Sequence, residues 1–402
     1  IKLGDAITVF MEVFGMDAML EMSENDYNKN VINTWKEFAA EGEKHKINLV
    51  LDPKKVQTKK SLLNYLIPQT QKKLKVVFLY AWLYSHELGR MYLDETFSDK
   101  LETEYVAGVD ENNVEQVLED IIKAGADIIF CVGPQMMPNS LKVAVEHPEV
   151  YILNCSLNAP HPYIRTYYGR MYEAKFLAGM IAGAVTDNER VAYIADYPIY
   201  GMIANINAFA LGVASVNPRA KVYLAWSKTK DYDRNKFLTE NDLHYVSDQD
   251  IITPNDASRY FGLYKLQDGQ ALNLAMPIWN WGVFYEKLLQ SVLAGSYKAE
   301  GQEQVKALNY WWGMSAGVID LICSKHVPYG VKRLADHLKS DITKGEVVPF
   351  FGQIYDQKGE LKNKGEHEMK PSDIMKMDWL VDNVVGSIPP MSEFVDNAKM
   401  VV

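Results

Sequence analysis

Aromatic and polar side chains gather directly after several predicted strands, and together they have the chemistry to hold a flat heteroaromatic molecule. The first half of the chain contributes Trp82, Tyr84, His86 and Gln135, and the second half contributes Tyr197, Asp248, Asp250, Trp279, Asn280 and Trp281. Indole and phenol rings stack on the faces of such a molecule, while amide and carboxylate groups form hydrogen bonds along its edge. A nucleobase fits this set. Each aromatic ring also has a simpler alternative role, which is to pack a core or a domain interface.

Signals for catalysis are weak. Gly313 to Gly317 matches the nucleophile-elbow pattern around Ser315, but an elbow follows a strand, whereas this serine precedes the apolar run 318–322. The eight histidines form no recognisable metal-ligand pair, and no phosphate-binding glycine loop of standard spacing is present. Cys131 and Cys155 fall in predicted buried strands, which favours inert core thiols. We therefore expect no cofactor, no metal and no catalytic residue.

An alternation of apolar strands and helices begins at Leu74 and must position these side chains. We predict strands at 76–79, 103–106, 127–132, 150–154, 191–195, 221–226 and 243–246, with helices at 112–123, 203–216 and 233–238. Strands that are apolar throughout and alternate with helices are typical of a parallel sheet covered on both faces. The pattern restarts near residue 191, so we expect two α/β lobes. Ligands of such sheets bind beyond the carboxyl ends of the strands, here in a cleft between the lobes.

Residues 1–73 differ from the rest of the chain. Ile7, Phe10 and Phe14 recur at helical spacing, and Trp35 and Phe38 share the face of a second amphipathic segment. We expect a small helical appendage that ends in a polar linker.

Length and composition limit the class of protein. The chain has 402 residues, of which 48% are hydrophobic and 23% charged, which is typical of a folded protein of two or three domains. No apolar stretch reaches the roughly 18 residues of a membrane span. The formal charge of −10 argues against nucleic acid as a direct partner of the main body. Three scattered cysteines and a start without an export signal favour a reducing, cytoplasmic compartment.

Several segments, in order, resemble the basic membrane protein family of substrate-binding proteins. The similarity extends from Leu74 to about Pro390 and runs through Trp82–Arg90, Tyr172–Gly179, Asp196–Ile199, Asn205–Phe209, Pro277–Gly282, Ile354–Gln357 and Met377–Leu380. The resemblance implies a two-lobed type I periplasmic-binding-protein-like fold that serves an ABC importer and binds a purine base or nucleoside. It also implies an extracytoplasmic, membrane-associated location, in contrast to the cysteine and export-signal argument, so the compartment stays open.

The resemblance also implies how the chain divides and where the ligand binds. We expect one lobe at 74–166 plus 265–300, the other at 167–264 plus 301–390, and a tail at 391–402. Trp82 and the turn from Trp279 to Trp281 would approach the ligand from the first lobe, and Tyr197 and Asp250 from the second. An ABC permease would be a partner of the complex.

This chain departs from the family pattern in three places. The loop at Tyr80-Ala81-Trp82 is several residues short, and Lys265 stands where the family carries an acidic acceptor. Either change implies that the ligand differs from a purine or that affinity is lost. The helical appendage is similar to larger Firmicutes-type chains, so a cytoplasmic sensing module that contacts another protein domain is one alternative. A purine-processing hydrolase or transferase that uses Asp250 or Ser315 is another.

Overall fold

The computed structural model describes residues 73–80, 84–158, 160–198, 201–249, 259–294, 297 and 309–395. The predicted appendage therefore lies outside the described residues, as do Trp82 and Asp250. The chain divides into two units, each described by itself: an N-terminal unit within Met22–Gly169 and Asn280–Trp312, and a C-terminal unit within Arg170–Trp279 and Gly313–Val402.

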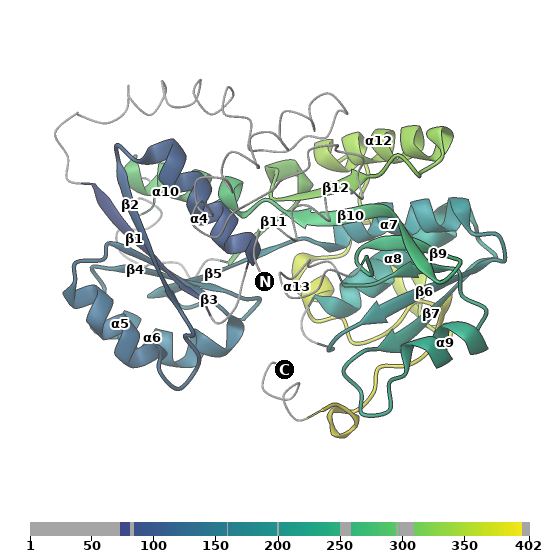
Figure 1. The fold of residues 1–402 in the computed structure, drawn as a ribbon, viewed down its shortest axis with the longest axis horizontal. Coiled ribbons are helices and arrows are strands. Elements are labelled where there is room, and N and C mark those ends of the chain that lie inside the picture. Colours follow the sequence, from purple (N-terminus) through teal and green to yellow (C-terminus); the bar gives the residue numbers. More distant parts are fainter. Residues whose placement is uncertain are drawn as a thin grey trace. The chain divides into compact units, whose positions relative to one another are not determined.

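The N-terminal unit is built on a six-stranded sheet in the order β11-β5-β4-β3-β1-β2, and every neighbouring pair is parallel (Figure 1). Its elements are β1 (Leu74–Tyr80), α4 (Tyr84–Phe97), β2 (Leu101–Ala107), α5 (Val114–Lys123), β3 (Ile128–Val132), α6 (Met137–Glu146), β4 (Tyr151–Cys155), β5 (Ile164–Gly169), α10 (Trp281–Leu293) and β11 (Asn309–Trp312). The strands β1, β3 and β4 are buried almost throughout, as their apolar runs predicted. The predicted parallel sheet is confirmed.

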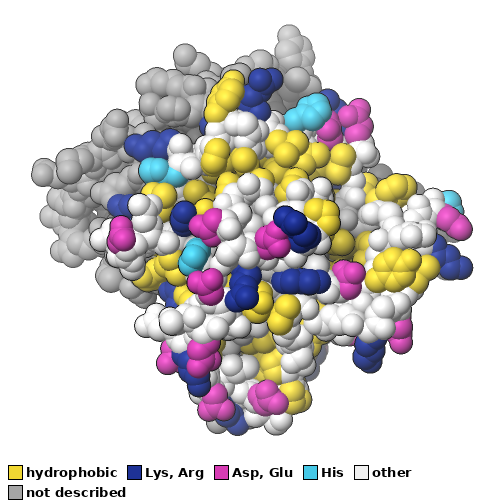
Figure 2. All heavy atoms as spheres, turned by 90° about the vertical axis from the view of Figure 1, so that its right-hand side faces the viewer, with side chains coloured by type: hydrophobic (Ala, Val, Ile, Leu, Met, Phe, Trp, Pro, Cys, Tyr) yellow, Lys and Arg dark blue, Asp and Glu magenta, His cyan; other side chains and the backbone are white. Residues whose placement is uncertain are grey.

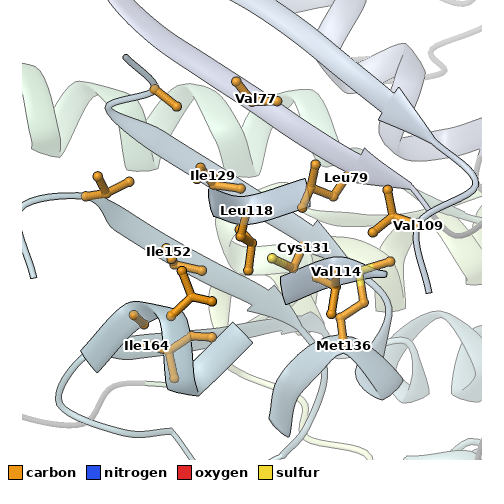
Figure 3. Close-up of a cluster of buried hydrophobic side chains, with 14 of the residues drawn as sticks. Val77, Leu79, Val109, Val114, Leu118, Ile129, Cys131, Met136, Ile152 and Ile164 are labelled. Carbon is orange, nitrogen blue, oxygen red and sulfur yellow. The ribbon is translucent and has the colours of Figure 1, made fainter. Parts of the chain in front are cut away.

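Helices cover both faces of this sheet. On one face, Val114 and Leu118 of α5 pack with Val77, Ile129 and other aliphatic side chains of the strands in a single core cluster (Figure 3). On the other face, the ring of Phe78 meets that of Tyr285 in α10 edge-on, with 4.9 Å between ring centroids. Burying strands on both faces is what makes such a sheet stable in water.

The C-terminal unit contains a mixed seven-stranded sheet in the order β12-β10-β9-β8-β6-β7-β15. Its elements are α7 (Tyr172–Val185), β6 (Arg190–Ala195), α8 (Met202–Val216), β7 (Lys221–Trp226), α9 (Arg234–Glu240), β8 (Tyr245–Ser247), β9 (Leu263–Gln267), β10 (Gln270–Trp279), β12 (Ile319–Cys323), α12 (Tyr329–Lys344), β13 (Gln353–Tyr355), β14 (Leu361–Lys364), α13 (Pro371–Met375) and β15 (Val384–Val385). Strands β7, β6 and β8 are parallel, whereas β9 and β10 form an antiparallel hairpin. Figure 2 shows acidic and basic side chains interspersed over one face of the molecule.

The β9–β10 hairpin differs from the division of the chain expected from the sequence. We expected residues 265–300 to join the first lobe, but β10 pairs with β9 and β12 in the C-terminal unit up to Trp279. The reversal occurs at Asp268 and Gly269, which both have positive φ angles of 51° and 76°. Two adjacent residues with positive φ are typical of a tight hairpin turn. The chain therefore returns to the N-terminal unit at Asn280 instead of at residue 265.

Glycines let two helices of the C-terminal unit approach each other closely. A Cβ atom on Gly179 of α7 would lie 2.0 Å from the carbonyl oxygen of Phe209, and one on Gly212 of α8 would lie 2.0 Å from that of Phe176. Because each contact is with main-chain atoms, a side-chain rotation cannot relieve it. The close contact between the α7 and α8 backbones therefore requires a glycine at the end of the segment Phe176–Gly179.

No helix among the described residues is both long enough and apolar enough to cross a lipid bilayer.

Candidate functional site at the carboxyl ends of the strands

The carboxyl ends of four strands in the C-terminal unit bring predicted site residues to one edge of its sheet. Asp196 follows β6, Ser227 follows β7 and Asp248 follows β8, and these three strands are parallel. Strand β10 is two antiparallel steps from β8, so it runs in the same direction and ends at the same edge with Trp279. This edge is where ligands of α/β sheets bind.

Asp248 is the most firmly held of these residues. Its Oδ2 lies 3.1 Å from Nη2 of Arg234 and accepts a hydrogen bond of 3.0 Å from the Tyr264 hydroxyl. Its Oδ1 accepts a 2.9 Å bond from the main-chain N–H of Gln249. Burial raises the pKa of Asp248, although the Arg234 guanidinium beside it acts to lower that pKa. The carboxylate predicted to accept bonds from a ligand is thus already engaged by partners within the protein.

Arg234 lies beside Asp248 and was not predicted from the sequence. It is the first residue of α9, and its guanidinium carbon lies 3.8 Å from the centre of the Tyr260 ring. The Tyr264 hydroxyl is also a hydrogen-bond partner of Nη2. The helix begins there because the Asp233 side chain accepts a 3.0 Å bond from the main-chain N–H of Lys236, as an N-cap does. The sequence signal that could have indicated Arg234 is a basic residue directly after a capping aspartate, shortly after a strand.

A second carboxylate lies at the end of β6. Oδ1 of Asp196 accepts a hydrogen bond from the Ser227 hydroxyl at the end of β7. Tyr197 is partly buried, and its pKa is raised by burial and by the charge of Asp196. The charge of Asp196 also makes a minor contribution to the raised pKa of Asp248, which is raised mainly by burial.

Trp279 offers a hydrogen-bond donor at the end of β10. Its side chain is partly buried, and its indole Nε1 is a buried atom without a hydrogen-bond partner among the described residues. Buried indole N–H groups usually find an acceptor. An acceptor supplied by a ligand would meet that need. Asn280 follows as the N-cap residue of α10.

In the N-terminal unit, His86 and Trp281 lie inside the fold. Each is only 3% exposed, and their rings stack on each other with centroids 4.2 Å apart. Nδ1 of His86 is hydrogen-bonded to the Tyr285 hydroxyl, and its Nε2 lies 3.8 Å from Sγ of Cys155. Burial holds the pKa of His86 well below its usual range. The contact of His86 and Trp281 with a ligand therefore stays a prediction, and the burial of both rings does not support it.

The remaining predicted residues of the N-terminal unit fall at the carboxyl edge of its sheet. Gln135 lies in the short 3₁₀ turn Pro134–Met136 after β3, and its side chain lies over Gly133, where a Cβ would be 2.8 Å from Oε1. Asn154 near the end of β4 was not predicted; it donates a 2.8 Å bond to the carbonyl of Gly133. Its Oδ1 is buried and has no partner in the described part of the chain. Tyr84 begins α4, but its side chain lies outside the described residues.

Groups that would indicate other chemistry are in unsuitable environments. Ser315 lies in a 3₁₀ turn that precedes β12, the reverse of the order in a nucleophile elbow. Burial raises the pKa of the Cys131 thiol to about 12 and also raises that of Cys155, so both thiols stay protonated near neutral pH. Among the described residues, no three acidic, histidine or cysteine side chains gather where they could bind a metal ion.

Comparison with known proteins finds similarity to substrate-binding proteins of ABC transporters. Residues 80–259 match the family model Bmp, the PnrA-like ABC transporter substrate-binding proteins. The chain is 28% identical over 340 residues to a purine-binding protein of Brucella abortus, an alignment that covers 79% of this chain and 95% of the relative. It is 30% identical over 251 residues to a Haloferax volcanii protein named as a candidate ABC transporter glucose-binding protein, covering 59% of this chain and 62% of the relative.

A solved structure resembles most of the described fold. It is a transcriptional activator of the comK gene from Bacillus halodurans, with a TM-score of 0.55 and 14% sequence identity, covering 69% of this chain and 100% of that chain. At this identity the likeness concerns the fold alone. The type I periplasmic-binding-protein-like fold predicted from the sequence is confirmed.

Proposed function

Because residues 80–259 match the family model of PnrA-like ABC transporter substrate-binding proteins, we propose that this protein binds a purine base or nucleoside and releases it unchanged. The family consists of binding proteins, not enzymes. The observation that carries the choice of a purine is the alignment with the purine-binding protein of Brucella abortus, which extends over 95% of that relative.

The chemistry at the carboxyl edge of the C-terminal unit supports this proposal. A purine needs a flat surface on its face and a mixture of donors and acceptors along its rim. The edge carries the partly buried indole of Trp279, whose N–H is without a partner among the described residues, and the guanidinium of Arg234. It also carries the carboxylates of Asp196 and Asp248. That the ligand lies in a cleft between two lobes stays a prediction.

The proposed partners follow from the family. ABC transporter substrate-binding proteins bind a small ligand and deliver it to a permease, and we propose both partners for this chain. Glucose is a second candidate ligand, because the Haloferax volcanii relative is named for it. Aromatic and carboxylate groups also suit a sugar, so the two candidates must be separated by experiment.

Titration calorimetry of the full chain with hypoxanthine, guanosine, adenine and D-glucose tests the proposal. We expect saturable binding of at least one purine with a dissociation constant on the order of 1 μM or tighter, which corresponds to a binding free energy of about −8 kcal/mol. We expect no saturable binding of glucose. Chromatography of the purine recovered afterwards should show it unchanged. Saturable binding of glucose alone would contradict the purine proposal, and a new product peak would favour the hydrolase or transferase alternative.

A further inference from the structure

The guanidinium of Arg234 is fixed in place at the edge of the C-terminal sheet. Its Nη2 lies 3.1 Å from Oδ2 of Asp248, and its carbon lies 3.8 Å from the centre of the Tyr260 ring. Tyr264, whose hydroxyl contacts both Nη2 and Oδ2, is fully buried. An arginine held by an ion pair and an aromatic ring loses little further freedom when it binds a ligand.

This guanidinium still has donors to offer. Its hydrogen bonds and its ion pair within the described part of the chain use Nη2, so among these residues Nε and Nη1 have no partner. The side chain is 24% exposed, against 14% for Asp248. Arg234, which can only donate hydrogen bonds, is therefore the more exposed member of the pair, and the Asp248 carboxylate holds it in place.

Purines differ in what they present to such a donor. A 6-oxopurine has two neighbouring acceptors, O6 and N7, on one edge, whereas adenine replaces O6 with an amino group that is itself a donor. An amino group facing a guanidinium would leave two donors opposed and unpaired. Leaving a buried polar group unpaired costs enough to change affinity roughly tenfold or more.

We propose that Arg234 contacts the ligand directly and selects a 6-oxopurine, such as hypoxanthine or guanine, over adenine. This inference rests on the proposed function, because it names which purines the same site takes. Asp248 and Tyr264 then act as positioning residues for Arg234.

The experiment compares the affinities of hypoxanthine and adenine by calorimetry in the wild type and in three variants at pH 7.5. Arg234→Gln replaces the donor-only group with an amide that both donates and accepts, which is the group that pairs with the N6 and N7 atoms of adenine. Arg234→Lys keeps a donor-only cation. Arg219→Gln is the matched control, because Arg219 is 82% exposed and pairs with Glu189 on the surface of the same unit.

We expect the wild type, Arg234→Lys and Arg219→Gln to bind hypoxanthine roughly tenfold more tightly than adenine, and Arg234→Gln to lose that preference or reverse it. If Arg234 had a purely structural role, Arg234→Gln would lower the affinities for hypoxanthine and adenine equally and leave their ratio unchanged. That result would overturn the inference. Equal affinity of the wild type for both bases would overturn it as well, while leaving purine binding intact. If the wild type binds neither base, the selectivity fails; the proposed function fails with it only if guanosine does not bind either.

Discussion

Gly212→Ala is expected to lower the melting temperature of the protein by roughly 6 to 12 °C, since a loss of about 3 kcal/mol shifts a cooperative unit of this size by that amount. The added Cβ would lie 2.0 Å from the carbonyl oxygen of Phe176 and 2.9 Å from the main-chain nitrogen of Met180. Both atoms belong to the backbone of α7, so α7 and α8 would have to move apart along a buried interface. Differential scanning calorimetry measures the shift.

Gly330→Ala is the matched control for this substitution. Gly330 also lies in a helix of the C-terminal unit, but a Cβ there would meet no heavy atom within 4 Å. Alanine favours the helix by about 1 kcal/mol over glycine, so the melting temperature should stay the same or rise slightly. Equal melting temperatures for Gly212→Ala and Gly330→Ala would show that α7 and α8 are not in backbone contact.

Asp248→Ala should weaken hypoxanthine binding by roughly 30-fold or more, because truncating one partner of a partly buried, hydrogen-bonded charged pair costs about 2 kcal/mol or more. The change removes the carboxylate that pairs with Arg234 and accepts from the Tyr264 hydroxyl. Without that anchor the guanidinium no longer points consistently at the ligand. Asp248→Asn keeps an acceptor for Tyr264 while removing the charge, and we expect its affinity for hypoxanthine to fall about tenfold.

The control for Asp248→Ala is Glu240→Ala, which removes an exposed carboxylate at the end of α9 in the same unit. Its affinity for hypoxanthine should match that of the wild type. Both proteins should be compared at a temperature well below their melting transitions, so that a difference in binding does not reflect unfolding. Unchanged affinity in Asp248→Ala would mean that neither Asp248 nor its hold on Arg234 contributes to the site.

Local pattern was enough to predict much of the fold. The apolar runs at 127–132 and 150–154 became β3 and β4, and the alternation with helices correctly indicated a parallel sheet. The β9–β10 hairpin escaped prediction because its turn at Asp268–Gly269 depends on two positive φ angles, which a sequence shows only weakly. Without that turn, residues 265–300 were assigned to the first lobe.

Candidate site residues could be predicted where their position depends on the end of a strand. They could not be predicted where it depends on the direction in which a side chain points. Asp248 comes shortly after a predicted strand, so its place at the sheet edge followed from the strand assignment. Trp279 ends β10 in the C-terminal unit, whereas we expected it to approach the ligand from the first lobe. His86 and Trp281 also occur near element ends, but their rings turn inward and stack on each other. The pairing of Arg234 with Asp248 joins residues from a helix and a strand, so only the tertiary structure reveals it.

A crystal structure of the full chain grown with hypoxanthine tests the central claim most directly. We expect an intact purine ring at the carboxyl ends of β8 and β10, with a ring acceptor within hydrogen-bond distance of Arg234 or of the Trp279 indole N–H. A chemically altered base would contradict it. So would a ring bound away from both residues, or electron density at this edge that contains no purine at saturating hypoxanthine.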